Sequence, residues 1–209
     1  MAGILCIAAL GAAPAALAQT TVLALGDSLT QGYGLKQSDG FVPQLEGWLR
    51  GRGHDVTIVN GGVSGDTTQG GRNRVDWSLT PEVDAMIVTL GGNDILRGID
   101  PAVTRANLDY ILDAADAKDI PSLVVGLYAS RNYGESYKAA FDAIHPELAK
   151  AHGALYEPNF FQGLADDTGD PSTYRQWMQA DGIHPSAEGV KRIVARIGPR
   201  VEELIARVE

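Results

Sequence analysis

Apolar and polar residues alternate in blocks along the chain, and the blocks predict a regular succession of strands and helices. Short apolar runs with β-branched residues are typical of buried parallel strands. Five such runs, the last of them weaker, lie at residues 21–25, 55–60, 84–90, 122–127 and 154–156. Apolar residues at helical spacing occupy residues 41–49, 103–115, 136–151 and 186–207. Because alternating strands and helices pair in parallel through right-handed crossovers, we expect a three-layer α/β/α sandwich of about five parallel strands.

Polar, glycine-bearing segments follow the first three expected strands. They are residues 26–29 (Gly-Asp-Ser-Leu), 60–67 (Asn-Gly-Gly-Val-Ser-Gly-Asp-Thr) and 91–94 (Gly-Gly-Asn-Asp), and a fourth polar segment, residues 181–185 (Asp-Gly-Ile-His-Pro), precedes the last helix. The carboxyl ends of parallel strands meet at one edge of a sheet, where ligands bind. We therefore expect these segments to converge, although the first alone also fits a turn in which Asp27 or Ser28 caps a helix.

Ser28 is the candidate nucleophile, and a nucleophilic serine needs a general base. His184 is the best candidate by elimination, and Asp181, three residues earlier, can orient its imidazole. The other histidines are expected elsewhere, before the second strand or on a polar helix face or its end: His54, His145 and His152. The alternative is a helix-entry histidine with Asp181 as a cap.

An acyl-transfer site also needs hydrogen-bond donors for the oxyanion. The Asn93 side chain, the Gly65 backbone N–H and the Ser28 N–H at a helix start are the candidates. Glycine and asparagine are also ordinary turn residues, so one such cluster alone would be weak support. Three clusters at successive strand ends favour a site.

Four further polar residues in these segments are predicted to accept hydrogen bonds from backbone N–H groups. We expect Asp27 and Asp94 to fix their loops through hydrogen bonds to backbone N–H groups rather than to transfer protons. We expect Asp66 and Thr67 to cap the helix that follows the second strand.

Residues 1–18 differ from the rest of the chain. They contain no charged side chain, are rich in alanine, and end in Ala-Leu-Ala, a small-x-small cleavage pattern. This predicts a signal peptide that is removed after Ala18, a mature domain of residues 19–209 and a periplasmic or secreted protein. The segment lacks the basic residue usual near the start of a signal peptide, and a buried N-terminal helix is the alternative. Cys6, the only cysteine, lies within it.

Composition narrows the range of partners. The chain has 209 residues, of which 44% are hydrophobic and 21% charged, which suits one globular domain. The formal net charge is −9 and no run of Lys and Arg occurs, which disfavours a nucleic-acid partner. No integral membrane span is expected in the mature chain.

The four polar segments, in this order and spacing, resemble the conserved blocks of the GDSL, or SGNH, hydrolases. The likeness spans essentially the whole mature chain. It is greatest to the bacterial periplasmic thioesterase, lysophospholipase and arylesterase group, whose local signatures resemble residues 60–68, 90–98, 132–134 and 176–185. The resemblance implies a flavodoxin-like sandwich with strand order 2-1-3-4-5. It also implies a mobile loop at residues 94–100, whereas residues 160–175 match no part of the family pattern.

The resemblance also implies roles for the candidate residues. Ser28 would be the nucleophile, His184 the base and Asp181 its orienting carboxylate. An oxyanion hole would consist of the Ser28 and Gly65 N–H groups and the Asn93 side chain. The implied activity is hydrolysis of an aryl ester, acyl thioester or lysophospholipid through an acyl-enzyme, without a cofactor or metal.

Other functions fit the residues less well. An α/β-hydrolase needs Gly-x-Ser-x-Gly around its nucleophile, and neither Ser28 nor Ser64 has glycine at the last position. A flavodoxin-like module that binds a phosphate or flavin would have backbone donors here, but the glycine and lysine motifs of such sites are missing. The histidines lack the spacing of common metal sites. A carbohydrate acetyl esterase of the same family is the remaining alternative.

Overall fold

A five-stranded parallel sheet forms the centre of the protein in the computed structural model, which describes residues 19–165 and 171–208. The strands lie in the order β2-β1-β3-β4-β5. Their bounds are β1 (Thr20–Gly26), β2 (Val56–Gly62), β3 (Ala85–Thr89), β4 (Ser122–Val125) and β5 (Leu155–Glu157). The predicted strand order is confirmed. The predicted signal peptide lies outside the described residues.

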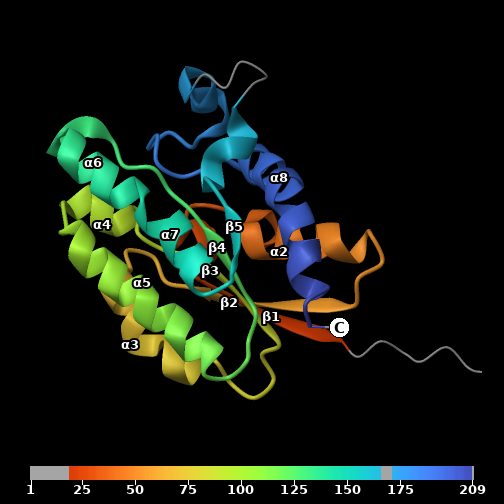
Figure 1. Ribbon diagram of the computed structural model, residues 1–209. Coiled ribbons are helices and arrows are strands. Elements are labelled where there is room, and N and C mark those ends of the chain that lie inside the picture. The colour runs from red at the N-terminus through yellow and green to blue at the C-terminus, as the bar shows by residue number, and fades with distance from the viewer. Residues whose placement is uncertain (1–18, 166–170, 209) are drawn as a thin grey trace, which may run out of the picture.

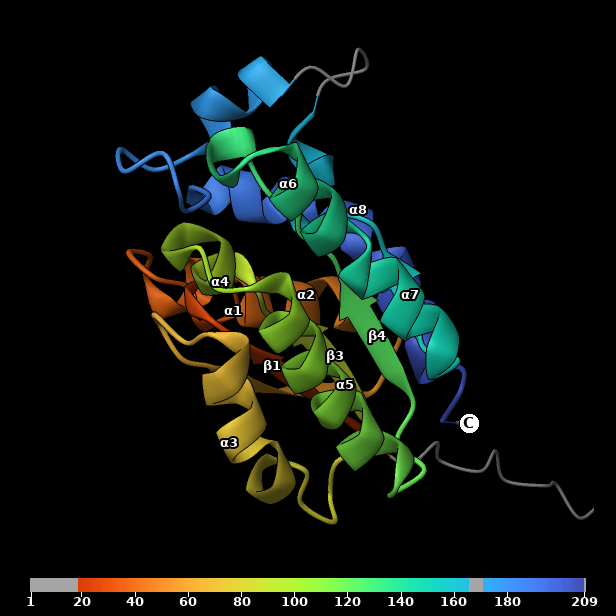
Figure 2. The ribbon, with the colours of Figure 1, turned by 60° about the vertical axis from the view of Figure 1, so that its left-hand side comes forward.

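Helices cover both faces of the sheet (Figures 1 and 2). One face packs against α2 (Phe41–Arg50) and α8 (Ala187–Ile205). The other packs against α3 (Thr68–Ser78), α5 (Pro101–Asp116) and α7 (Ile144–Ala151). The predicted three-layer α/β/α sandwich is therefore confirmed.

Strand β1 shows how the apolar run creates two cores. Successive side chains of a strand point to opposite faces. Val22 and Ala24 pack with α2 and α8, whereas Leu23 and Leu25 pack with α3, α5 and α7. All four are at most 2% exposed, so β1 is buried on both faces, as expected for an inner strand of a parallel sheet.

The helices depart from the prediction in two places. Residues 136–151, expected as one helix, form α6 (Glu135–Asp142) and α7. Pro146 accounts for the break, because it has no N–H to donate to Asp142 and its ring would clash with that carbonyl. The segment 94–100, expected as a loop, is helical to Arg97 as part of α4 (Gly92–Arg97).

The remaining elements are short. The helix α1 spans Ser28–Gln31. Four 3-10 helices complete the described chain: η1 (Gln37–Asp39), η2 (Arg131–Tyr133), η3 (Phe160–Leu164) and η4 (Pro171–Trp177). The helix η3 and most of η4 lie within residues 160–175, for which the sequence predicted no element.

The ends of the three strands that carry polar segments are level with one another. Gly26 pairs with Gly62 of β2 and with Thr89 of β3. Gly26 itself must be small, because a Cβ there would lie 2.0 Å from Thr30 Oγ1. The three strands therefore end level with one another, and the polar segments lie at the same edge of the sheet.

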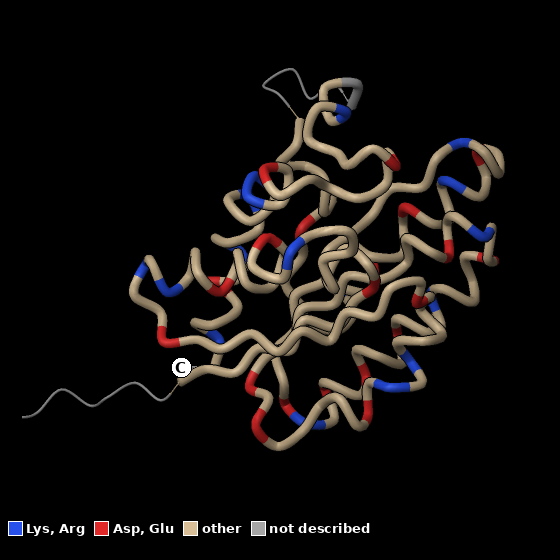
Figure 3. The backbone as a smooth tube through the Cα atoms, turned by 180° about the vertical axis from the view of Figure 1, so that it is seen from behind, with Lys and Arg blue, Asp and Glu red and all other residues tan. Residues whose placement is uncertain are grey.

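Charged residues lie almost entirely outside the sheet. Acidic and basic positions are interspersed along the surrounding helices and loops (Figure 3). The strands carry a single charged residue, Glu157 at the end of β5. Among the described residues, no helix has both the length and the apolar character that crossing a membrane requires.

Candidate active site

Ser28 lies at the point where β1 turns into a helix. It is the first residue of α1 and is half-buried. Asp27 occupies the N-cap, and its Oδ1 accepts a hydrogen bond from Leu29 N–H at 3.0 Å. The sequence therefore predicted the backbone-fixing role of Asp27 correctly. This cap holds the serine at the edge of the sheet with its hydroxyl available to other segments.

Asp181, His184 and Ser28 form a continuous chain of hydrogen bonds. The Ser28 hydroxyl donates to His184 Nε2 at 2.8 Å, and His184 Nδ1–H donates to Asp181 Oδ2 at 2.7 Å. The other carboxylate oxygen of Asp181 accepts the N–H groups of Ile183 and His184. The hydrogen bond from the His184 ring, together with these backbone bonds, lowers the pKa of Asp181 to about 2.

The loop that carries His184 is fixed by a residue that the sequence analysis did not single out. Gln179 N–H donates to His184 O at 2.7 Å. The Gln179 side-chain Nε2 donates to Tyr33 O and to Pro185 O. The Tyr33 ring lies 4.7 Å from the imidazole, centroid to centroid. The loop before α8 is thus tied to the segment after α1, which keeps the imidazole near Ser28.

Gly65 lies in a tight turn beside Ser28 in the cleft. The turn runs from Val63 to Asp66 and is closed by Asp66 N–H, which donates to Val63 O at 3.0 Å. Gly65, at the third position, has a φ of +83°, a conformation that favours glycine. Among the described residues, the Gly65 N–H has no hydrogen-bond partner. It is therefore free to bind a ligand atom.

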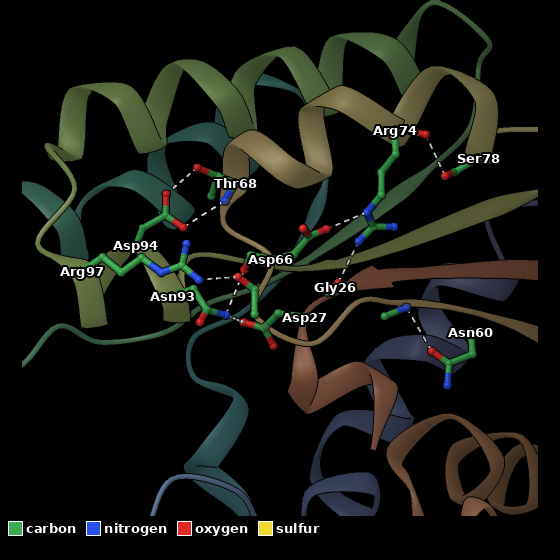
Figure 4. A network of polar contacts seen from close by, with 12 residues as sticks. Gly26, Asp27, Asn60, Asp66, Thr68, Arg74, Ser78, Asn93, Asp94 and Arg97 are labelled. Atoms are coloured by element: carbon green, nitrogen blue, oxygen red, sulfur yellow. Dashed lines mark hydrogen bonds and ion pairs between the residues drawn. The ribbon is translucent and has the colours of Figure 1, made fainter. Parts of the chain in front are cut away.

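Asn93, on α4, contacts the polar segments that follow β1 and β2. Its Nδ2 donates to Asp66 O at 2.9 Å and, over a longer distance of 3.3 Å, to Asp27 Oδ2. Figure 4 shows the Asn93 amide between these two acceptors. The four polar segments therefore converge, and Ser28, Gly65 and Asn93 all line one cleft with Asp181 and His184.

The capping predicted for Asp66 and Thr67 is wrong. Thr67 stands at the N-cap of α3 but makes no side-chain capping bond. Asp94, from α4, takes that place: its Oδ2 accepts Thr68 N–H at 2.9 Å. Asp66 instead accepts a charged hydrogen bond from Arg74 Nε at 2.8 Å. Asp94 was predicted to accept backbone N–H groups and does so, but the N–H that it binds belongs to α3 rather than to its own loop.

Arg74 links two of the converging segments and was missed by the sequence analysis. It is 8% exposed, and one terminal nitrogen donates to Gly26 O at 2.8 Å while Nε binds Asp66 (Figure 4). Arg74 thereby connects the residue before Asp27 to the turn that contains Gly65. The sequence prediction of the site considered the segments that follow the strands, whereas Arg74 lies inside α3.

Burial dominates the electrostatics of Asp27. The side chain is 2% exposed, and burial raises its pKa to about 6, an effect that the hydrogen bonds from Leu29 and Asn93 offset only in part.

A second carboxylate, that of Glu157 at the end of β5, is also buried. Its side chain is fully buried, and burial raises its pKa as well. It pairs with Arg196 at 3.2 Å, and Arg196 lines the cleft.

The walls of the cleft are largely apolar. Residues from α4, η3 and η4 and from the segments that follow β4 and η4 contribute, among them Ile95, Leu127, Phe161, Tyr174 and Met178. The described parts of the segment that the sequence left unassigned, residues 160–165 and 171–175, therefore contribute to this cleft. An apolar groove that leads to a serine hydroxyl can accommodate a ligand with a hydrocarbon portion.

The other histidines lie away from Ser28. His54 precedes β2, at the edge of the sheet opposite to that of Ser28, as predicted, and its Nε2 lies 2.9 Å from Glu202 Oε1. His145 was expected on a polar face, but it is 1% exposed, its Nε2 donates to Leu90 O and burial lowers its pKa. His152 is at the end of α7, as predicted, and contacts Asp116 and Asp109.

Within residues 19–165 and 171–208, one group of side chains has the atoms to hold a metal ion. Ligand-type atoms of Asp113, Asp116 and His152 lie within 4.8 Å of one another, and the two carboxylates are exposed. None of the three lines the cleft of Ser28.

Comparison with known proteins assigns the chain to a family. The profile of the GDSL-like Lipase/Acylhydrolase family matches residues 24–192, which is most of the chain. The chain belongs to this family. Membership agrees with the predicted class of enzyme, a carboxylic ester hydrolase.

Curated relatives of this GDSL acylhydrolase match along nearly its whole length. Esterase TesA of Pseudomonas aeruginosa is 35% identical over 90% of each chain. Thioesterase 1/protease 1/lysophospholipase L1 of Escherichia coli is 34% identical over 91% of this chain and 87% of its own. An arylesterase of Vibrio mimicus is 33% identical over 83% and 84%.

Two solved structures are similar to this chain over most of its length. A crystal structure of TesA is 34% identical with a TM-score of 0.78, and it covers 88% of this acylhydrolase and 99% of its own chain. The SGNH-hydrolase family esterase AlinE4 is 39% identical with a TM-score of 0.71, over 88% and 96% of the two chains.

The raised pKa of Asp27 predicts a distinctive pH dependence of stability. The native pKa of about 6 lies above the ordinary value of 3.8, so folding favours the protonated form. The resulting stabilisation is fully present below about pH 4 and is lost as the pH rises through about 6. As the pH rises from about 4 to about 7, the free energy of unfolding of Asp27→Asn, measured in urea, should therefore increase by roughly 3 kcal/mol relative to that of the wild type. Parallel stability curves for the two proteins would contradict this assignment.

Proposed function

We propose that the protein is a serine esterase that hydrolyses carboxylic esters through an acyl-enzyme on Ser28. The observation that carries the proposal is the hydrogen-bonded series from Asp181 through His184 to the Ser28 hydroxyl. A serine, an imidazole and a carboxylate in this arrangement form a nucleophile, a base and the group that orients the base.

The proposed reaction proceeds in two steps. His184 Nε2 takes the Ser28 proton while Oγ attacks the ester carbonyl carbon, and the imidazolium then protonates the leaving group. Water, deprotonated by the same nitrogen, hydrolyses the acyl-enzyme and regenerates the serine hydroxyl. Throughout, Asp181 keeps Nδ1 protonated and stabilises the imidazolium.

The oxyanion of each tetrahedral intermediate would bind to the Ser28 N–H, the Gly65 N–H and Asn93 Nδ2. The unpartnered Gly65 N–H supports this assignment. The bond of Asn93 to Asp66 O, at 2.9 Å, holds the amide in place, whereas the bond to Asp27, at 3.3 Å, is long enough for the oxyanion to replace it.

We propose as substrates esters with an apolar acyl or aryl portion: aryl esters, acyl thioesters or lysophospholipids. The apolar walls of the cleft support this class. So do the names of the relatives, which include an arylesterase and a thioesterase/lysophospholipase. The chemistry at Ser28 is the same for all three substrates, because each presents an acyl carbonyl with a leaving group on oxygen or sulfur.

We also propose that the protein is exported to the periplasm or secreted and acts there as residues 19–209. The support is the uncharged, alanine-rich character of residues 1–18 and the Ala-Leu-Ala pattern at their end.

Replacing the nucleophile tests the activity. Ser28→Ala should abolish hydrolysis of p-nitrophenyl acetate, an acyl thioester and a lysophospholipid alike, with the circular dichroism spectrum unchanged. Ser130→Ala is the matched control, because Ser130 also lines the cleft but is not within the hydrogen-bonded series, and it should retain activity. Near-wild-type hydrolysis by Ser28→Ala would refute the proposal.

The processing site has its own test. Edman sequencing of the protein recovered from the periplasm or medium of an expressing bacterium should begin at Gln19. Recovery of the chain with Met1 intact would show that residues 1–18 are retained.

A further inference from the structure

We propose that the cleft has a subsite, at its β5 end, for an anionic oxygen group of the substrate, and that Arg196 binds this group. Arg196 belongs to α8 and lines the cleft. It forms an ion pair with Glu157, the last residue of β5. The inference rests on the proposed function, because the anionic group is part of a molecule whose acyl carbonyl reacts at Ser28.

Glu157 fixes the guanidinium of Arg196. The Glu157 side chain is fully buried, and within residues 19–165 and 171–208 neither of its carboxylate oxygens has a hydrogen-bond partner. The opposite charge comes from Arg196, whose Nη2 lies 3.2 Å from Oε1. A buried carboxylate is costly without such a charge, so Glu157 keeps the guanidinium at this position. The arginine is therefore ordered before a ligand binds, which favours binding.

The same arginine has donors left for a ligand. A guanidinium carries five N–H groups in a planar fork, and the ion pair with Glu157 engages one terminal nitrogen. The Arg196 side chain is 46% exposed and lines the cleft. Carboxylates and phosphates fit the guanidinium fork through two parallel hydrogen bonds. Arg196 can therefore hold Glu157 on one side and a second anionic group on the other.

The charges of the cleft favour an anion at this end. Among the described residues, the carboxylates that line the cleft are Asp27 and Asp181, which lie beside the nucleophile and its base. The lining arginines are Arg196 and the exposed Arg175 of η4, and η3 packs against both α8 and η4. Two guanidinium groups against the single carboxylate of Glu157 give the described residues of this end a net positive charge. Such an excess attracts an anionic group.

The sheet sets the distance between Ser28 and this subsite. Ser28 follows β1 and Glu157 ends β5, so both lie at the edge of the sheet where the parallel strands end. The strand order places β5 three strands from β1, and three spacings of about 4.8 Å separate them by roughly 14 Å. A group bound at Arg196 is therefore remote from the reacting carbonyl. It belongs either to the acyl portion, as a terminal carboxylate, or to the leaving group, as a terminal phosphate.

Half-esters of dicarboxylic acids test the acyl source. The p-nitrophenyl half-esters of succinic, adipic, suberic and sebacic acids carry a carboxylate at increasing distance from the reacting carbonyl, and straight-chain p-nitrophenyl esters of equal carbon number are their neutral partners. The measured quantity is the ratio of kcat/KM for the anionic ester to that for the neutral ester. In Arg196→Gln this ratio should fall about 10-fold for the long half-esters, because a charged contact is lost at a partly exposed site. It should stay unchanged for the succinate, which is too short to reach Arg196.

Thioesters test the leaving-group source. Octanoyl phosphopantetheine carries a phosphate at the far end of its thiol, and octanoyl pantetheine is the same thioester without that phosphate. If the leaving group occupies the subsite, the anionic-to-neutral ratio for this pair falls about 10-fold in Arg196→Gln, and the ratios for the half-esters stay unchanged. The pair whose ratio falls identifies the portion of the substrate that reaches Arg196.

Two further variants control for charge and for folding. Arg200→Gln is the matched control, because Arg200 lies on the same helix, is 43% exposed and pairs with Glu203 outside the cleft, and it should leave every ratio unchanged. Arg196→Gln alone leaves Glu157 buried without its opposite charge. The double variant Glu157→Gln/Arg196→Gln removes both charges, so it should retain the wild-type circular dichroism spectrum and show the same fall in ratio.

The outcomes separate the subsite from the proposed function. Wild-type ratios for both substrate types in the double variant, an equal fall in Arg200→Gln, or an equal fall at every chain length of the half-esters overturns the subsite and leaves Ser28 as the nucleophile. Full hydrolysis by Ser28→Ala in the same assay refutes the proposed function and the subsite with it. A fall for the long half-esters or for the thioester pair, which Arg200→Gln does not share, supports the subsite.

Discussion

Parallel pairing of β1 with β2 and β3 is the constraint on which the site depends. The register sets Gly26, Gly62 and Thr89 at one level. A polar segment follows each of these strands, so the three segments lie side by side at one edge of the sheet. Buried apolar side chains on both faces of β1 hold this register, because a slip by one residue would exchange the two cores. Packing energy far from Ser28 thus fixes where the serine lies.

Backbone carbonyls, rather than side chains alone, organise the edge of the sheet. Arg74 binds Gly26 O, Asn93 binds Asp66 O and Arg97 binds Gly65 O. The Gly65 and Asp66 carbonyls lie in the turn after β2, outside the sheet, so a long donor side chain can fix this turn where strand pairing cannot. Ser28, Gly65 and Asn93 belong to separate polar segments, and these contacts connect the segments.

Much of this arrangement follows from the sequence. Strand positions and the convergence of the polar segments could be predicted because periodicity and parallel topology are local signals with one geometric consequence. His184 was reached by elimination, since the other histidines fall outside the strand ends. The roles of Arg74, Arg97 and Gln179 could not be predicted in this way. Their partners are backbone atoms distant in sequence, and an arginine in a polar helix looks the same whether it reaches solvent or a carbonyl. The burial of His145 was missed because its helix face is set by the break at Pro146.

Covalent labelling of the serine tests the account most directly. A p-nitrophenyl phosphonate ester transfers its phosphorus to an activated serine, and peptide mass spectrometry then locates the adduct. The account predicts one adduct per chain, on the peptide that contains Ser28, with stoichiometric release of p-nitrophenol. An adduct on another residue, or an unlabelled protein that still hydrolyses esters, would contradict the central claim that the acyl group is carried by Ser28.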